Sequence, residues 1–380
     1  MKKLIILLFS VINLEAIAQP VKSQLYADST FGWMKIYNNT VVPKPISSEG
    51  KTYSTAQLQI ANKFQEWMQQ SYLPKGGSGE IKKFVNDDAT FIENKKALYH
   101  SYGAYAKTYT ILKKDANGKI VPMTGDGYTW HIRANGIATF STEVESLSSD
   151  EQYYFTLQAV RQDDKTANTQ DVESAKLSGF GTHPMLNQYS HFYTSKNNTD
   201  AGSFYVVILC QDNKLPWIPI TKAEYFQKLE EGINREYQKE IALRTRTKQT
   251  DYVERAKDTF KKAMVNLKRL KEKYENQMNE FAALRSNDDP GGYHISNYKN
   301  GEPDMFDEKK GYPAFPIYKV PKQTLDKCSS PQPQWIAIYW DPQLHLHESI
   351  LSNFNFDYVY NYFFDKDKIT GPYKPRRSPK

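Results

Sequence analysis

Cysteine is nearly absent from this chain, and its scarcity rules out disulfide-rich and zinc-finger scaffolds. Only Cys210 and Cys328 occur among 380 residues. They form no C-x-x-C pair, and no set of cysteines and histidines has the spacing of a zinc site. Two interpretations stay open: a single disulfide, which an oxidising compartment would allow, or two separate thiols with Cys210 buried at the end of a strand.

Long hydrophobic runs are also absent. A membrane-spanning helix needs about 20 apolar residues, and no run in the chain reaches that length. The N-terminus has instead the pattern of a secretory signal, because Lys2 and Lys3 precede a short apolar stretch that ends in a small-x-small cleavage site at residues 16–18. We predict that residues 1–18 are a signal peptide and that the mature chain is exported, to the periplasm or the extracellular space, without a transmembrane segment.

A strong excess of one charge is missing. The 50 Lys and Arg residues against 43 Asp and Glu residues give a net charge of +7. We expect this excess to be spread along the chain, apart from a short basic tail at residues 374–380. Nucleic-acid-binding domains usually show clustered positive charge, so no nucleic-acid partner is expected.

Linear signatures of catalysis or cofactor binding are missing as well. Ser48 and Lys51 have the S-x-x-K spacing of some enzymes that act on cell-wall peptides, but they lie in a polar, glycine-containing stretch and no K-T-G follows. Residues 76–79, Gly-Gly-Ser-Gly, fit neither a nucleophile elbow nor a P-loop and indicate a turn. We expect no cofactor, and a non-catalytic protein is favoured.

His345 and His347 are the strongest metal candidates that remain. On a strand their side chains would share one face, and two imidazoles with a carboxylate can hold zinc. On a helix they would lie about 200° apart and could not share a metal. Asp341 and Pro342 make a good start for a helix, so we predict no metal site.

Aromatic residues, by contrast, are abundant at 14%. Exposed tyrosine and tryptophan faces can stack on sugar rings, which makes Trp130, Trp217, Trp335 and Trp340 candidates for a ligand-stacking site. The alternative is that these side chains pack in the core of a sheet, where aromatic cross-strand pairs are common.

The segment 19–220 predicts an α+β domain. A helix over residues 55–72 follows a good N-cap at Ser54 or Thr55. Seven short strands then alternate with turns, and the polar stretch 162–178 indicates a long loop. We predict an antiparallel sheet with this helix packed on one face. The strands are expected at residues 104–112, 120–121, 128–133, 137–142, 153–160, 189–194 and 204–209.

Residues 221–286 predict a long helical arm. Thr221 and Glu224 match a capping box at its start, and an apolar stripe recurs about every four residues behind it. The stripe lapses in the polar stretch 244–250. We therefore predict two coiled-coil-like helices, arranged either as an antiparallel hairpin or as one bent rod.

The C-terminal segment, residues 287–380, begins irregular and proline-rich, with one strand expected at residues 335–340. Aromatic residues then recur at every second position from Phe354 to Phe364. Because this stretch is so rich in aromatic residues, it must be buried. We therefore expect the C-terminal segment to pack back on the sheet domain.

These features favour an exported, non-catalytic protein that binds another envelope protein or a glycan, with the helical arm presenting surface to the partner. The alternative is a secreted hydrolase of glycans or peptides. Its site would be assembled from residues scattered along the chain, because active sites often leave no linear motif.

Overall fold

The fold is given by a computed structural model of the 380-residue chain. The predicted signal peptide, residues 1–18, lies outside the part that is described. The structure describes residues 32–36, 46–48, 50–73, 77–85, 90–91, 96–97, 99–109, 112–114, 116–117, 120–122, 127–149, 151–157, 159, 169–194, 203–285, 296, 304–307 and 314–377.

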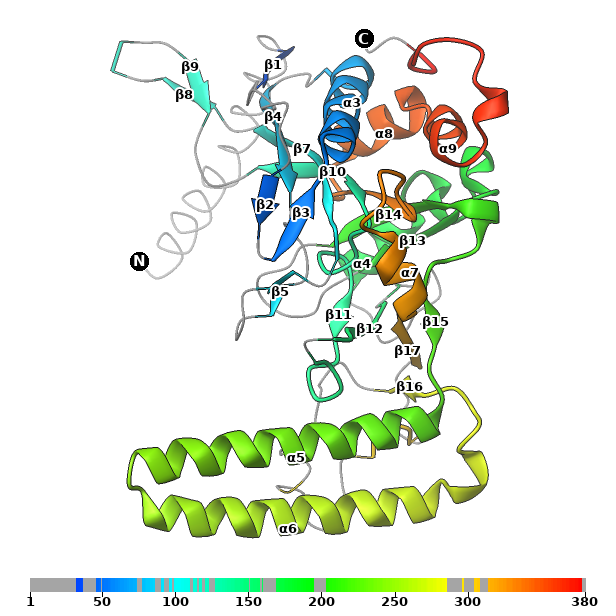
Figure 1. The fold of residues 1–380 in the computed structure, drawn as a ribbon. Coiled ribbons are helices and arrows are strands. Elements are labelled where there is room, and N and C mark those ends of the chain that lie inside the picture. The colour runs from blue at the N-terminus through cyan, green and yellow to red at the C-terminus, as the bar shows by residue number, and fades with distance from the viewer. Residues whose placement is uncertain are drawn as a thin grey trace, which may run out of the picture.

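The centre of the molecule is a seven-stranded sheet in the order β1-β4-β7-β10-β18-β14-β13 (Figure 1). All neighbouring strands are antiparallel except β1 and β4, which are parallel. The mixed α+β class predicted from the sequence is confirmed. The strands are β1 (Gly32–Ile36), β4 (Gly77–Val85), β7 (Tyr102–Tyr109), β10 (Tyr128–Ala134), β18 (Trp335–Trp340), β14 (Phe204–Cys210) and β13 (Ser190–Thr194).

The strand β18 lies between β10 and β14, although it comes much later in the chain than either of them. All six of its residues are buried, as are all seven of β14. Strands covered on both faces carry an unbroken apolar run, and the sequences WIAIYW and FYVVILC have that character. The register places Trp130 of β10 opposite Trp340 of β18.

Three helices pack on one face of this sheet: α3 (Thr55–Ser71), α8 (Leu344–Asn353) and α9 (Phe356–Phe364). The predicted cap of α3 is confirmed. The Ser54 hydroxyl accepts a hydrogen bond from the Gln57 backbone amide, and the Gln57 side chain accepts one from the Ser54 amide. These reciprocal bonds satisfy donors that the first helical turn leaves free.

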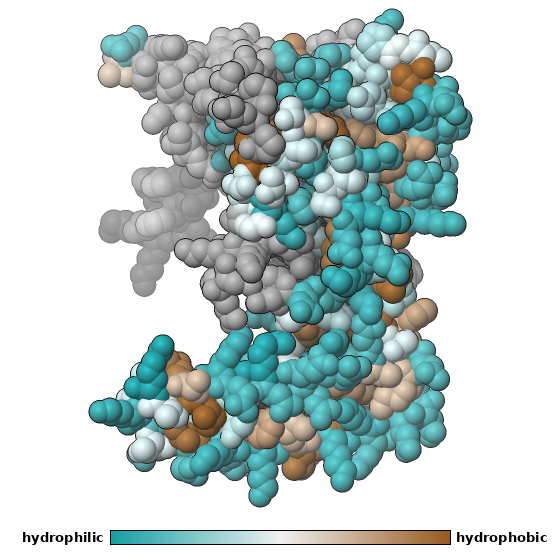
Figure 2. Space-filling view, in the orientation of Figure 1, coloured by the Kyte–Doolittle hydropathy of each residue, from teal (hydrophilic) through white to brown (hydrophobic). Residues whose placement is uncertain are grey.

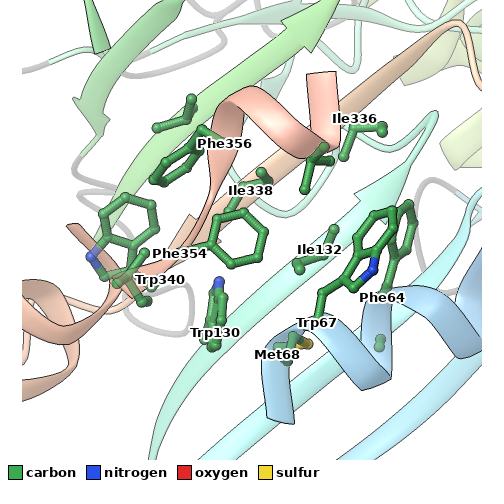
Figure 3. Packing of buried hydrophobic residues seen from close by; sticks show 14 of the residues in the cluster. Phe64, Trp67, Met68, Trp130, Ile132, Ile336, Ile338, Trp340, Phe354 and Phe356 are labelled. Carbon is green, nitrogen blue, oxygen red and sulfur yellow. The ribbon is translucent and has the colours of Figure 1, made fainter. Parts of the chain in front are cut away.

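The largest apolar cluster fills the space between these helices and the sheet. Figure 3 shows Phe64, Trp67 and Met68 of α3 on the same side of the sheet as Trp130 and Phe354. Trp130 and Phe354 meet edge to face, with ring centres 5.4 Å apart and planes at 89°. Aromatic pairs prefer this arrangement to face-to-face contact.

A second cluster covers the opposite face of the sheet. Phe140, Phe155 and Trp217 belong to it, together with Trp335 and Tyr339 of β18. The odd-numbered residues of β18 therefore face this cluster, while the even-numbered ones face the helices. This alternation follows from the period of two in a strand.

A smaller sheet joins this body to a pair of long helices (Figure 1). Its strands run in the order β11-β12-β17-β15, and β16 also pairs with β17. They are β11 (Thr142–Glu143), β12 (Tyr154–Thr156), β17 (Phe315–Lys319), β15 (Ile218–Pro219) and β16 (Ala283–Leu284).

The two long helices, α5 (Lys222–Arg246) and α6 (Thr250–Lys273), pack against each other and run in opposite directions at the end of the molecule away from α3 (Figure 1). The Thr221 hydroxyl accepts from the Glu224 amide, as predicted. The Glu224 side chain accepts from Tyr154 and Lys319 rather than completing the predicted capping box.

Short elements complete the described fold, and among them are three two-stranded hairpins. None of the described helices is both long enough and apolar enough to cross a membrane. The short elements are β2 (Ile46–Ser48) with β3 (Lys51–Tyr53), β5 (Thr90–Phe91) with β6 (Lys96–Ala97), β8 (Leu112–Lys114) with β9 (Ile120–Pro122), and helices α4 (Thr169–Lys176) and α7 (Lys322–Lys327).

The aromatic stretch near the C-terminus forms the helix α9, although its period of two is typical of a strand. Asn355 begins the helix by accepting a hydrogen bond from the Tyr358 amide. The buried residues of α9 are Phe356, Val359 and Phe363, which recur at helical spacing. The helix therefore buries one apolar stripe and leaves the alternating tyrosines half-buried.

Three other segments also differ from the sequence prediction. Of the strand expected at residues 137–142, residues 137–141 turn rather than extend, since the carbonyl of Ile137 accepts from the amides of Phe140 and Ser141, and only Thr142 is in a strand, β11. The expected loop at 162–178 contains the helix α4. The glycine-rich stretch expected as a turn begins β4, which pairs with β1 on one side and β7 on the other.

Candidate functional site

The four tryptophans that the sequence offered for sugar stacking are all buried. Trp130 and Trp340 lie in the cluster under the helices, and Trp217 and Trp335 in the cluster on the opposite face. The indole N–H of Trp335 donates to the carbonyl of Gly136 at 3.1 Å. Neighbouring side chains cover their faces. The four tryptophans therefore pack in the core, as the alternative interpretation predicts, and the prediction that they form a sugar-stacking site is wrong.

The two histidines proposed as metal candidates both lie on α8 and are not brought together. His347 is buried, and the Trp340 indole N–H donates to its Nδ1 at 3.2 Å. His345 lies against the ring of Tyr72 instead, with ring centres 5.9 Å apart. Over the described ranges no three His, Cys, Asp or Glu side chains are grouped as metal ligands.

Both cysteines are free thiols in the structure, so the disulfide left open by the sequence is not formed. They are buried in the same cluster, and the Cys328 thiol donates to the carbonyl of Thr324 at 3.3 Å. Burial raises the pKa of each thiol to about 12. Thiols with a raised pKa are poor nucleophiles, which makes a catalytic role for either cysteine unfavourable.

The helix pair is the most unusual surface of the described chain, and its charge differs from the sequence expectation. Residues 222–273 contain fifteen Lys or Arg residues against nine Asp or Glu residues, a net charge of +6 out of +7 for the whole chain. The positive excess is therefore concentrated in α5 and α6 rather than spread along the chain.

The half of the pair near the small sheet is fixed to the body. Tyr154 donates to Glu224 at 3.0 Å, and the Lys319 ammonium donates to the same carboxylate oxygen at 2.5 Å. Arg235 donates to the carbonyl of Ser148 at 2.8 Å. Tyr225, Phe226, Leu229 and Ile233 of α5 and Leu267 and Leu270 of α6 are buried in a third apolar cluster.

The other half, which we call the free half (residues 236–259), ends at the turn between the helices. A hollow of about 440 Å³ lies between α5 and α6 there. Figure 2 shows hydrophobic surface at this end of the pair, framed by hydrophilic surface. The hollow is lined by Glu236, Lys239, Glu240, Leu243, Tyr252, Arg255, Ala256 and Thr259.

The floor and rim of this hollow have opposite chemistry. Leu243 is 40% exposed and Tyr252 is 46% exposed. The guanidinium groups of Arg244 and Arg255 lie 4.9 and 5.2 Å from the centre of the Tyr252 ring. Arg244 is itself held in place by Glu240, at 2.8 Å. An apolar anchor point is thus bordered by two arginines, of which Arg244 is held in position by Glu240.

Sequence reasoning identified the helical arm but missed the residues of the hollow. The available signal was the lapse of the apolar stripe at residues 244–250, because Leu243 and Tyr252 flank it. Apolar residues beside such a gap, like Leu243 and Tyr252, stay partly exposed and are therefore candidates for contact with another molecule.

No protein-family model, curated protein or solved structure matches this chain. The functional interpretation therefore rests on the geometry and charge of the helix pair.

Proposed function

We propose that this is an exported, non-catalytic binding protein of the periplasm or extracellular space, and that it docks an acidic protein partner of the envelope on the free half of α5 and α6. The single observation that carries the proposal is the exposed apolar hollow around Leu243 and Tyr252 at the free end of the pair. Export rests on the signal peptide predicted at residues 1–18.

The chemistry of the hollow favours a protein partner over a glycan. Tyrosine and arginine are among the residue types enriched at the energetic centres of protein interfaces, and two arginine guanidinium groups lie 4.9 and 5.2 Å from the centre of the Tyr252 ring. The hollow would accept one apolar side chain of the partner. The net charge of +6 on the helix pair, of which +5 lies outside the free half, would speed the approach of an acidic partner to the pair as a whole.

The finer architecture of the arm belongs to the same proposal. Phe260, Leu267 and Tyr274 recur every seven residues along α6 and its C-terminus, and Phe260 stacks on Tyr237 with ring centres 4.3 Å apart. This spacing supports coiled-coil-like packing that keeps the two antiparallel helices aligned along their length. Such packing would hold the hollow at a fixed distance from the body of the protein.

The test is a pull-down of the mature, full-length protein from its own envelope fraction. Leu243→Ser with Tyr252→Ser is expected to lower the yield of the captured partner at least about tenfold, since each residue would supply anchor energy of about 1 kcal/mol or more. Val265→Ser is the matched control, because Val265 is 60% exposed on α6 but does not line the hollow.

Two results would contradict the proposal. One is equal capture by the hollow variant and the Val265→Ser control. The other is capture that does not weaken as salt is raised, since screening reduces attraction between an acidic partner and exposed cations.

A further inference from the structure

A second hollow lies at the other end of the molecule, between α3, the turn after α7 and the end of α9. Its volume is about 680 Å³, within the range of about 300–1,000 Å³ that small-molecule sites have. It is separate from the helix pair, which lies at the opposite end (Figure 1). Its lining is Ala56, Gln59, Ile60, Lys63, Ser330, Pro331, Gln332, Tyr362, Phe363, Lys366 and Ile369.

The floor of this hollow, which we call the α3–α9 groove, is apolar and rigid. Phe363 is buried, and its ring packs against Phe64 and Trp67 of α3 with centres 5.8 and 6.1 Å apart. Ile60 packs on the edge of the same cluster. Because the floor is part of the main core, it does not need to form when a ligand arrives.

The opposite wall is fixed by hydrogen bonds. The Gln332 side chain donates to the carbonyl of Phe363 at 2.7 Å, which ties the turn to α9. The Gln57 side chain donates to the carbonyl of Ser330 at 3.2 Å, which ties the same turn to α3. A site whose walls are already ordered loses less entropy on binding.

The charged groups at the rim are all of one sign. Lys63 and Lys366 line the groove and no Asp or Glu does. Within the described part of the chain neither lysine forms an ion pair, and the Lys63 ammonium lies 5.4 Å from the centre of the Tyr362 ring. Lys368, by contrast, is paired with Asp365 at 2.7 Å and does not line the groove.

We propose that the α3–α9 groove binds a small amphiphilic carboxylate, with its apolar body on Ile60, Phe363 and Ile369 and its carboxylate at Lys63 and Lys366. The lysines have long apolar stems that can follow such a body while their ammonium groups reach the anion. A neutral amphiphile would lose the contacts to the lysines, and a cationic one would meet two like charges.

The test is calorimetric titration of the full-length mature protein with octanoate, octanol and octyltrimethylammonium. Octanoate is expected to bind at one site, more tightly than octanol, while the cation shows no binding. Lys63→Gln combined with Lys366→Gln is expected to weaken octanoate binding about five- to tenfold, because two partly exposed ion pairs with the carboxylate are lost and such pairs are individually weak.

Controls separate charge from packing and from folding. Lys368→Gln should leave octanoate binding unchanged, and the double lysine variant should bind octanol as the parent does. Ile60→Gln should weaken both ligands. The proposal is overturned if no probe binds at millimolar concentration, if the cation binds as well as octanoate, or if the double lysine variant keeps the parent affinity while its thermal midpoint matches that of Lys368→Gln.

Discussion

The main sheet encloses a histidine between two tyrosine rings. His131 lies 4.5 Å from the Tyr339 ring centre, with planes at 9°, and 5.4 Å from that of Tyr105, at 22°. Its Nδ1 has no hydrogen-bond partner among the residues described. Burial, reinforced by the charge of Arg133, holds the pKa of His131 well below its usual value. The folded protein therefore keeps this imidazole neutral.

This geometry predicts a loss of stability in mild acid. An unfolded histidine titrates near about 6.5, so below that pH the unfolded state binds more protons than the folded one and the free energy of unfolding falls. His131→Phe keeps a flat ring in the stack and removes the titrating group. Denaturant titrations at about pH 7.5 and about pH 5 should show a smaller loss of unfolding free energy in the variant than in the parent.

The His131→Phe variant is still expected to lose some unfolding free energy in acid, because the pKa of His100 is also lowered in the folded protein. Burial, followed by repulsion from Lys51, lowers the pKa of His100 to about 4, so it acts in the same direction between about pH 6.5 and pH 4. Equal losses in the parent and in His131→Phe would show that His131 is protonated in the folded state.

At the scale of elements, one glycine decides how closely α5 approaches the body. Gly232 faces the loop before β12, where an added Cβ would collide with the carbonyl oxygen of Ser146. The contact is with backbone, which cannot rotate away as a side chain can. Alanine would favour the helix by up to about 1 kcal/mol, but the collision forces α5 away from its seat.

We expect Gly232→Ala to lower the free energy of unfolding by about 1–3 kcal/mol, the usual cost of forcing atoms into a packed site. Gly371→Ala is the control, because a Cβ at Gly371 has nothing within 4 Å. Chemical denaturation of both variants measures the difference. A Gly232→Ala protein that is as stable as the control would mean that α5 is not seated against Ser146.

Elements set by short-range chemistry could be predicted from the sequence. The α3 helix follows from its Ser54 cap and its apolar spacing, and β14 and β18 follow from their unbroken apolar runs. The α9 helix could not be predicted from the alternation of its aromatic residues, which is typical of a strand. Its buried residues, Phe356, Val359 and Phe363, are three and four positions apart and so form one face of a helix. The strand β4 (Gly77–Val85) begins in the glycine-rich stretch that indicates a turn, and it pairs with β1 on one side and β7 on the other.

The two hollows differ in how far the sequence could predict them. The hollow of the helix pair is local, and its signal was the gap beside Leu243 and Tyr252. The α3–α9 groove joins Lys63 to Lys366 across the length of the chain, and no local pattern links the two. Only the packing of α3 and α9 on the same face of the sheet brings them together.

At the scale of the whole molecule, stability should be distributed unevenly. The strands β10, β14 and β18 are central in the sheet, and β14 and β18 are buried at every position. The free half of the helix pair is largely exposed, and none of its residues belongs to the three apolar clusters. Backbone amides are protected according to the free energy needed to open the surrounding structure.

Hydrogen exchange should therefore be slowest in peptides covering residues 204–210 and 335–340 and fastest, among the described helices, in those covering residues 236–259. Exchange followed by mass spectrometry on the full-length protein gives this ranking directly. Slow exchange in residues 236–259 of the isolated protein would mean that this surface is already covered, which would remove the reason for assigning it to a partner.

The position of β18 also constrains when the main sheet can fold during synthesis of the chain. A ribosome completes β10 and β14 long before it adds residues 335–340, and until then the gap between those two strands has no occupant. Contacts that distant in sequence form slowly and leave apolar edges open meanwhile. The helix pair, whose contacts are local, can form on the nascent chain, whereas the sheet must wait for nearly the last residues to be translated.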